Sequence, residues 1–191
     1  MITLVFATNN PNKQQEVQAK VGAAFKILSL ADINCTHDIA ETGLTLDENA
    51  SIKSRYIFDN YQLNCFGDDT GLEIEALDNQ PGVYSARYSG TRDSEKNIDL
   101  VLQKLAHSSN RNARFRTVIS LIINSKEYIF EGIVNGTIRH QRSGTGGFGY
   151  DAIFEPNGYG ITFAEMVLKE KNKISHRGLA LQKLITFLRQ L

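Results

Sequence analysis

Two adjacent carboxylates stand between glycines in the stretch Gly67-Asp68-Asp69-Thr70-Gly71. Mg²⁺ is a hard cation that keeps several of its waters and binds one or two carboxylates together with phosphate oxygens. Glu41, which also lies beside a glycine turn, is a further candidate ligand. The stretch therefore suits a magnesium site, although a plain acidic turn without a metal would have the same composition.

A lysine occupies a position where an isolated helix would disfavour it. Asn10 is a good N-cap and Pro11 suits the first helical position, which places Lys13 at the third. The free N–H groups and the dipole make that end of a helix positive, so an anion is needed to favour a cation there. The alternative is a solvated lysine that tolerates a small electrostatic cost.

A second lysine interrupts an apolar helix face. The face is formed by Leu46, Ala50, Ile57 and Tyr61. Lys53 takes the middle position of this stripe, and Asn49 lies one turn earlier on nearly the same face. A lysine that points into the protein needs a counter-charge or a cavity, unless its stem carries the ammonium group to a wet edge.

The same anomaly recurs near the end of the chain. His176 and Arg177 follow Ser175, a good helix cap, and Lys171 and Lys173 lie just upstream. A basic surface cluster would be the simplest explanation of this pattern. Acids for a metal and cations for phosphates together indicate phosphoanhydride chemistry, in which positioning and charge neutralisation supply most of the catalysis. The motif G-x-x-x-x-G-K-[ST] does not occur, which excludes a Walker-type enzyme.

A glycine fingerprint, G-x-G-x-x-G, is formed by Gly144, Gly146 and Gly149. It indicates dinucleotide binding only where it follows a strand and opens a helix. The alternating residues 128–134 predict the strand, but residues 150–160 hold a short apolar run and turn residues with no helical period. The sequence therefore predicts a strand, a glycine loop and another strand, not a Rossmann site.

The elements that must position these residues alternate between strands and helices before ending in a hairpin. Strands are predicted over residues 2–8, 26–30, 63–66 and 72–74, and a hairpin over 113–124 and 127–134 around Ser125-Lys126. Helices are predicted from Asn10 to about Phe25, over 45–61 behind a capping box, over 93–107, and after Ser175. This order predicts an α/β protein with a mixed sheet.

The composition is that of an ordinary globular protein. Of the 191 residues, 41% are hydrophobic and 22% charged, and 21 basic residues balance 21 acidic ones, so the basic footprint of a general nucleic-acid binder is absent. No apolar run is long enough to span a membrane, and we expect residues 1–8 to form a strand, not a signal peptide. Cys35 and Cys65 are expected to be buried or semi-buried thiols of a reducing cytosol.

Seven blocks, taken in order, resemble the inosine triphosphate pyrophosphatase family, the dITP/XTP pyrophosphatases that remove deaminated purine nucleotides. The blocks are Thr8-x-Asn10-x-x-Lys13, Glu41-Thr42-Gly43, Glu48-Asn49-Ala50-x-x-Lys53, Asp68-Asp69-Thr70-Gly71-Leu72, Pro81-Gly82-x-Tyr84-Ser85-Ala86-Arg87-Tyr88, Gly144-Thr145-Gly146-Gly147-Phe148-Gly149-Tyr150-Asp151 and Ser175-His176-Arg177-Gly178. The resemblance runs from the first strand to the last helix. Each block alone is weak, whereas the ordered set is specific.

The resemblance implies a fold and an activity. The fold would be an elongated mixed-sheet α/β domain over residues 1–191, with two lobes around one active-site cleft. The activity would be Mg²⁺-dependent hydrolysis of ITP, dITP or XTP to the monophosphate and pyrophosphate, by a homodimer. The cysteines, the charge balance and the hydropathy separately lead us to expect a cytoplasmic protein that binds neither nucleic acid nor membrane. A related pyrophosphatase acting on other modified nucleotides and a catalytically silent nucleotide-binding protein are the alternatives.

The resemblance also implies residue roles. Glu41 and Asp69 would organise Mg²⁺, with Asp69 as the base for the attacking water and Asp68 in support. The phosphates would be held by Asn10, Lys13 and Lys53, with Thr8 and Thr70 beside the substrate. Phe148 would stack on the purine as the glycine loop closes, with the base further surrounded by Gly149, Tyr150, Asp151, Lys171, His176 and Arg177. A donor-only guanidinium such as Arg177 would satisfy the C6 oxygen of hypoxanthine and be left unpaired by the amino group of adenine.

Two residues depart from the family pattern. Members usually carry glycine where this chain has Asn9, and often proline where it has Ala152. Neither change removes a charged or ligating group, so we expect activity to survive both.

Overall fold

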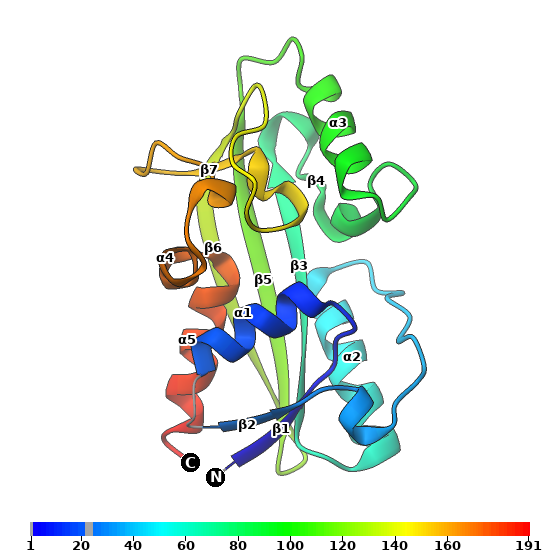
Figure 1. The fold of residues 1–191 in the computed structure, drawn as a ribbon. Coiled ribbons are helices and arrows are strands. Elements are labelled where there is room, and N and C mark those ends of the chain that lie inside the picture. The colour runs from blue at the N-terminus through cyan, green and yellow to red at the C-terminus, as the bar shows by residue number, and fades with distance from the viewer. Residues whose placement is uncertain (1, 22–24) are drawn as a thin grey trace. The chain divides into compact units, whose positions relative to one another are not determined.

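A computed structural model describes residues 2–21 and 25–191 of the chain as a mixed α/β protein (Figure 1). Its seven-stranded sheet has the order β2-β1-β3-β5-β6-β7, and β4 pairs with β3. The pairs β1–β2 and β1–β3 are parallel, whereas β3–β4 and β6–β7 are antiparallel. The predicted fold class, an α/β protein with a mixed sheet, is thereby confirmed.

The elements have the following bounds. The strands are β1 (Ile2–Phe6), β2 (Phe25–Leu28), β3 (Cys65–Ile74), β4 (Gln80–Pro81), β5 (Asn112–Ile123), β6 (Lys126–Ile138) and β7 (Phe154–Pro156). The α-helices are α1 (Pro11–Val21), α2 (Leu46–Tyr61), α3 (Ser94–Lys104), α4 (Leu168–Ile174) and α5 (His176–Leu188).

The helix starts that position the charged residues follow from local sequence. Asn10 caps α1, because its Oδ1 accepts hydrogen bonds from the backbone N–H groups of Asn12 (2.9 Å) and Lys13 (3.3 Å). The predicted capping box of α2 is present: the Thr45 hydroxyl accepts from Glu48 N–H, and the Glu48 carboxylate accepts from Thr45 N–H. Both helices therefore begin where the sequence predicted.

The chain divides into two compact units. The first comprises Met1–Asp69, Thr117–Gly132 and Arg177–Leu191. In this unit the sheet separates two apolar clusters. Leu4, Phe6 and Phe66 pack with α1 and α5, and Val5, Cys65 and Ile122 pack with Ile57 of α2. The predicted α5 stripe, formed by Leu181, Leu184, Ile185 and Leu188, is buried in the first of these clusters.

The second unit comprises Thr70–Arg116 and Ile133–His176. Its core joins α3 to the strands and to the segment around the glycine loop. The members include Leu72, Ile74, Ile98, Val101, Leu105, Phe115, Tyr150, Phe154 and Phe163. The predicted arrangement of one domain with a cleft between two lobes stays a prediction.

The stretch from Gly67 to Gly71 is the main correction to the predicted elements. The sequence indicated a turn between two short strands, but β3 runs unbroken from Cys65 to Ile74. A Cβ atom on Gly67 would lie 2.7 Å from the Ala50 carbonyl oxygen and 2.7 Å from the Lys53 Cβ. These glycines are therefore explained by close backbone packing within a strand, not by a turn.

Smaller differences concern element ends. The predicted extension of the first helix to Phe25 is wrong, because Phe25 begins β2; residues 22–24 lie outside the described residues. Helix α4 was not predicted. The hairpin is confirmed, but its loop residues are Asn124 and Ser125, at φ 51° and 61°, one position before the predicted Ser125-Lys126.

Two further expectations concern the cysteines and the membrane. Cys35 and Cys65 are free and buried, as predicted. In the described part of the chain, no helix has the length and apolar character needed to cross a membrane.

The contact at Gly67 leads to a stability prediction. Gly67→Ala would force a methyl group against α2, and we expect a loss of about 1–3 kcal/mol in the free energy of unfolding, the usual cost of overpacking. Urea denaturation of both proteins measures this difference. An unchanged unfolding midpoint and slope would show that α2 does not press on β3 at this point.

Candidate active site

Asp68 and Asp69 are neighbours in β3 and have different surroundings. Consecutive side chains of a strand point to opposite faces of the sheet. Asp68 alternates with Phe66, which packs with α1 and α5, whereas Asp69 alternates with Cys65, which packs with α2. Each carboxylate therefore has its own set of partners within the first unit.

Asp68 is held by two cations. Lys13 Nζ lies 2.9 Å from Asp68 Oδ1, and Arg177 Nε lies 2.9 Å from Asp68 Oδ2. The side chains of Asp68 and Arg177 are only 1% and 2% exposed, and Arg177 also forms an ion pair with Glu16 of α1. Burial alone would raise the pKa of Asp68, but the charges of Lys13 and Arg177 outweigh it and hold that pKa below its ordinary value.

Asp69 lies among residues of α2 and the preceding loop. Lys53 Nζ is 2.7 Å from Glu41 Oε1 and 3.5 Å from Asp69 Oδ1, and Asn49 Nδ2 donates to Asp69 Oδ2 at 3.1 Å. Burial, assisted by the charge of Glu41, raises the pKa of Asp69 despite the opposing charge of Lys53. For Lys53 the balance is reversed: burial lowers the pKa, but the charges of Asp69, Asp68 and Glu41 outweigh it and raise the pKa above its ordinary value.

These contacts explain the three misplaced cations. Lys13 meets Asp68, Lys53 meets Glu41 and Asp69, and Arg177 meets Asp68 and Glu16. Lys53 is 7% exposed, so its stem does not carry the charge to water, and the buried Arg177 excludes a basic surface cluster. The solvated alternative for Lys13 is likewise wrong, because its ammonium group bonds a buried carboxylate.

The two carboxylates predicted to organise Mg²⁺ are close to the same ammonium group. Glu41 and Asp69 both lie within 3.5 Å of Lys53 Nζ and offer hard oxygen donors. Over residues 2–21 and 25–191, no group of three or more His, Cys, Asp or Glu side chains is gathered as a metal site. Two carboxylates fit Mg²⁺, which completes its coordination with water and phosphate oxygens.

The glycine loop belongs to the second unit and is tied to a buried ion pair. Asp151 Oδ2 accepts from the backbone N–H of Phe148 at 2.8 Å and from Lys171 Nζ at 2.7 Å. Lys171 Nζ in turn lies 5.0 Å from the centre of the Phe148 ring. At Gly147 (φ 71°), an added Cβ would come within 2.1 Å of Asp151 Oδ2. The glycine there is therefore required by the approach of the carboxylate.

The segment after the loop confirms that the fingerprint is not a Rossmann site. Gly149, at φ 60°, opens a single 3₁₀ turn over Gly149–Ala152, and β7 follows. Tyr150 is buried and donates its hydroxyl proton to the Ser85 carbonyl oxygen at 2.8 Å. His176 is buried against Phe115, with ring centres 4.4 Å apart.

The predicted site residues thus form two groups. The first unit brings together Lys13, Asp68 and Arg177, and beside them Glu41, Lys53 and Asp69; Thr8 accepts from Asn10 N–H at 3.1 Å near the start of α1. The second unit brings together Phe148, Gly149, Asp151 and Lys171, and it also contains Thr70, Tyr150 and His176.

Arg177 differs from its predicted surroundings. The sequence suggested that its guanidinium faces a purine, but the structure places it in the first unit, bonded to Asp68 and Glu16. These two buried carboxylates supply the counter-charge for a buried cation. The predicted contact of Arg177 with a base stays a prediction.

Two contacts were not predicted. Glu16 was missed, although it lies one helical turn after Lys13 on the same face of α1. Asn49 was noticed only as a neighbour of Lys53 on α2, whereas the structure bonds it to Asp69. In both cases the i,i+3 or i,i+4 spacing to a misplaced lysine was the available signal.

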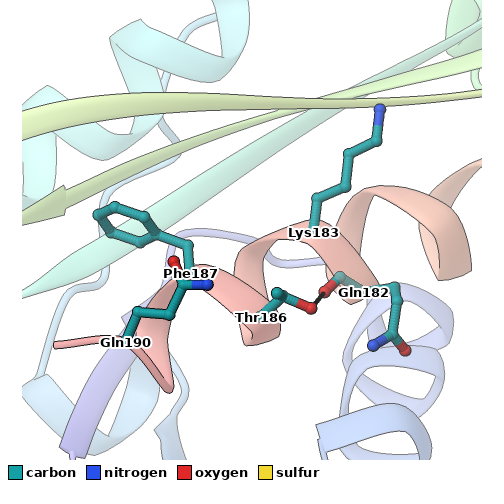
Figure 2. A pocket seen from close by; sticks show the side chains of 5 residues that line it. All are labelled: Gln182, Lys183, Thr186, Phe187 and Gln190. Carbon is teal, nitrogen blue, oxygen red and sulfur yellow. Dashed lines mark hydrogen bonds between the residues drawn. The ribbon is translucent and has the colours of Figure 1, made fainter.

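A surface depression of about 310 Å³ lies elsewhere, on α5 (Figure 2). Its lining consists of Gln182, Lys183, Thr186, Phe187 and Gln190. A hydrogen bond of 2.8 Å from the Thr186 hydroxyl to the Gln182 carbonyl oxygen satisfies part of its polar surface. None of these residues belongs to the two groups described above.

Comparison with known proteins gives consistent results across sequence and structure. Residues 4–187 match the model of the Ham1 family. The dITP/XTP pyrophosphatase of Christiangramia forsetii is 52% identical over 186 residues, covering 97% of this chain and 98% of the relative. That of Flavobacterium psychrophilum is 51% identical over 185 residues, covering 96% and 97%.

Two solved structures also match nearly the whole chain. The Staphylococcus aureus Ham1 protein has a TM-score of 0.90 at 35% identity and covers 98% of both chains. A HAM1 protein from Coxiella burnetii has a TM-score of 0.91 at 38% identity and covers 100% of both chains.

The ion pairs of Asp68 lead to a prediction on stability. Asp68→Asn would leave Lys13 and Arg177 without their shared carboxylate. We expect the free energy of unfolding to fall by about 3–5 kcal/mol, as for other broken buried ion pairs. Asp69→Asn is the matched control on the same strand and should leave stability unchanged or higher, because burial already disfavours that charge. Urea unfolding at neutral pH with EDTA measures both. Equal losses in the two variants would contradict the assignment.

The opposite pKa shifts of the two aspartates predict opposite pH dependences. The stability from Asp68 is fully present above its ordinary pKa of 3.8 and is lost as pH falls through the lower folded value. The charge on Asp69 instead costs stability as pH rises through its raised pKa. Melting temperatures from pH 3 to 8 should therefore show the deficit of Asp68→Asn shrinking toward low pH, and any gain of Asp69→Asn growing toward neutral pH. If the melting temperatures of both variants followed the wild-type curve in parallel over this pH range, the opposite pKa shifts of Asp68 and Asp69 would be contradicted.

Proposed function

The chain belongs to the Ham1 family, and we propose that it is an enzyme that hydrolyses deaminated purine nucleoside triphosphates. The family resemblance in the sequence is confirmed by the match over residues 4–187. One observation carries the proposal: lysines from two different helices lie on adjacent carboxylates of one strand, within a single unit. This arrangement suits a substrate that is itself a chain of anionic groups.

The substrates we propose are dITP, ITP and XTP. Relatives about half identical over nearly the whole chain carry the name dITP/XTP pyrophosphatase. The cations assigned to the purine edge, Lys171 and Arg177, have hydrogen-bond donors only. A further N–H group of either cation, beyond those bonded to Asp151 or to Asp68 and Glu16, would donate to the C6 oxygen of hypoxanthine or xanthine, and adenine would set its amino group against that donor. Unpaired buried polar groups of this kind produce strong discrimination.

Lys13 and Lys53 would hold the phosphates. In the structure each ammonium group is matched to protein carboxylates, so a triphosphate would share or replace these partners. Counted by formal charge, Lys13, Lys53 and Arg177 supply three cations against four carboxylates, those of Glu16, Glu41, Asp68 and Asp69. The excess of negative charge favours the binding of an added divalent cation. That cation would reduce the repulsion between the carboxylates and the triphosphate.

The two aspartates would have separate roles in hydrolysis. Asp68 has a cation on each oxygen and would fix Lys13 in place. Asp69 would accept a proton from the attacking water. The oxygen of that water would bond to the α-phosphorus while the bond between the α-phosphorus and the bridging oxygen of the α–β anhydride breaks. The products would be the nucleoside monophosphate and pyrophosphate. Mg²⁺ held by Glu41 and Asp69 would supply charge neutralisation at the phosphates.

Phe148 would provide the platform for the base. Its backbone N–H is fixed by Asp151, and the ammonium group of Lys171 lies over its ring. A purine stacked on the ring would gain about 1–3 kcal/mol, the usual value for base–aromatic stacking. The homodimeric state implied by the resemblance and the cytoplasmic location expected from the cysteines remain part of this proposal.

A pyrophosphate-release assay tests the activity. With Mg²⁺, we expect turnover of dITP, ITP and XTP to exceed that of ATP by about 10⁴-fold in kcat/KM, the discrimination that an unpaired buried donor can give. EDTA should abolish it. Asp69→Asn should lower kcat by about 10²–10⁴-fold, the usual contribution of a general base, while the melting temperature is kept.

Three outcomes would contradict the proposal in different ways. A preference for modified pyrimidine triphosphates would favour the related pyrophosphatases and overturn the base assignment. Binding of ITP with Mg²⁺ but without pyrophosphate release would favour a silent nucleotide-binding protein. Near-normal kcat in Asp69→Asn would place the base on another residue.

A further inference from the structure

A buried amide on α2 connects the two carboxylates assigned to the metal. Asn49 is fully buried, with a relative exposure of 0%. Its Oδ1 accepts from the backbone N–H of Gly43 at 2.8 Å, and its Nδ2 donates to Asp69 Oδ2 at 3.1 Å. Gly43 is two residues after Glu41. The Asn49 side chain therefore contacts the loop that carries Glu41, and it contacts the Asp69 carboxylate directly.

The loop is fastened to α2 at consecutive positions. The N–H groups of Leu44 and Thr45 donate to Glu48 Oε2 at 2.6 and 3.1 Å, next to the bond from Gly43 to Asn49. A Cβ on Gly43 would lie 2.6 Å from the Glu48 Cβ and 2.8 Å from Asn49 Oδ1. The loop therefore lies directly on the first turns of the helix, and Asn49 is its innermost attachment.

The amide also fixes the orientation of Asp69. Oδ2 is bonded to Asn49, while Oδ1 is the oxygen near Lys53, whose ammonium group also contacts Glu41. The amide donates to the Asp69 carboxylate through one terminal atom and accepts from the Gly43 backbone N–H through the other. Aspartate would keep the acceptor and lose the donor, and leucine would lose both.

We propose that Asn49 is a positioning residue for the reaction, setting both the rotamer of Asp69 and the place of the Glu41 loop. The inference rests on the proposed function, in which these two carboxylates hold the divalent ion. Hydrogen-bond partners of metal-binding side chains orient them, and removing such a partner typically costs about 10–100-fold in metal affinity or activity. The same loss is expected here.

Asn49→Leu, which is close in volume, tests the proposal. Mn²⁺ binding to the protein without nucleotide is followed by electron paramagnetic resonance, and kcat and KM for ITP are measured separately. We expect Mn²⁺ affinity and kcat to fall by about 10–100-fold. KM should change much less, because Lys13 and Lys53 are untouched.

Ser54→Ala is the matched control from the same helix. Ser54 is fully buried, and its hydroxyl is hydrogen-bonded to the Ser120 hydroxyl at 2.6 Å. The partners of Asp69 described above are instead Lys53 and Asn49. It should lower the melting temperature without changing Mn²⁺ affinity or kcat. If Asn49→Leu behaves as Ser54→Ala does, Asn49 is merely structural and the proposal is overturned.

Asn49→Asp keeps the shape and the acceptor for Gly43, so it decides the question if the leucine variant fails to fold. Because it presents an oxygen to Asp69 Oδ2, kcat should fall at least as far as in Asn49→Leu. Wild-type kcat in Asn49→Asp would overturn the inference. If no nucleotide releases pyrophosphate from the wild type, the proposed function fails, whereas an Mn²⁺ affinity lowered by Asn49→Leu would still support the positioning role.

Discussion

The alternation of side chains along β3 is the constraint on which the candidate site depends. Because neighbours in a strand face opposite sides of a sheet, Asp68 and Asp69 are separated in environment although they are adjacent in sequence. The α1–α5 side gives Asp68 two cations, and the α2 side gives Asp69 a lysine, a glutamate and an amide. A turn, which the composition suggested, would not have sorted the carboxylates in this way. Their distinct electrostatic states follow from one backbone conformation.

The buried charges follow from the same arrangement. An unpaired lysine or arginine would not be stable inside the protein, because removing an ion from water costs several kcal/mol. The attraction of a well-placed counter-ion is about large enough to offset this cost. Here Lys13, Lys53 and Arg177 come from three different helices and reach carboxylates of β3, α1 and the loop before α2. The helices are thus matched to the strand by charge as well as by apolar packing. The resulting site combines anionic and cationic groups, as polyphosphate chemistry with a divalent ion requires.

Features that depend on neighbouring residues could be predicted from the sequence. Features that depend on partners far away in the chain could not. The cap of α2, the β5–β6 hairpin and the α5 stripe involve residues within a few positions of one another, and each was predicted, the hairpin with its loop one residue too late. The strand through Gly67 and Asp69 was missed, because its polar residues are satisfied by side chains 16 to 109 positions away. Lys13, Lys53 and Arg177 were recognised as anomalous from their helix positions, but only the structure identifies their counter-charges. The contacts of Glu16 and Asn49 required the same long-range information.

The glycine loop has a consequence for how a ligand would be received. Asp151 accepts from the backbone N–H of Phe148 and from the ammonium group of Lys171, and all three residues lie within the second unit. A flexible loop must give up conformational freedom when it closes on a ligand, and that entropy loss is subtracted from the affinity. Here hydrogen bonds within the protein fix the backbone of Phe148, so little freedom would be lost at that residue when a ligand contacts its ring.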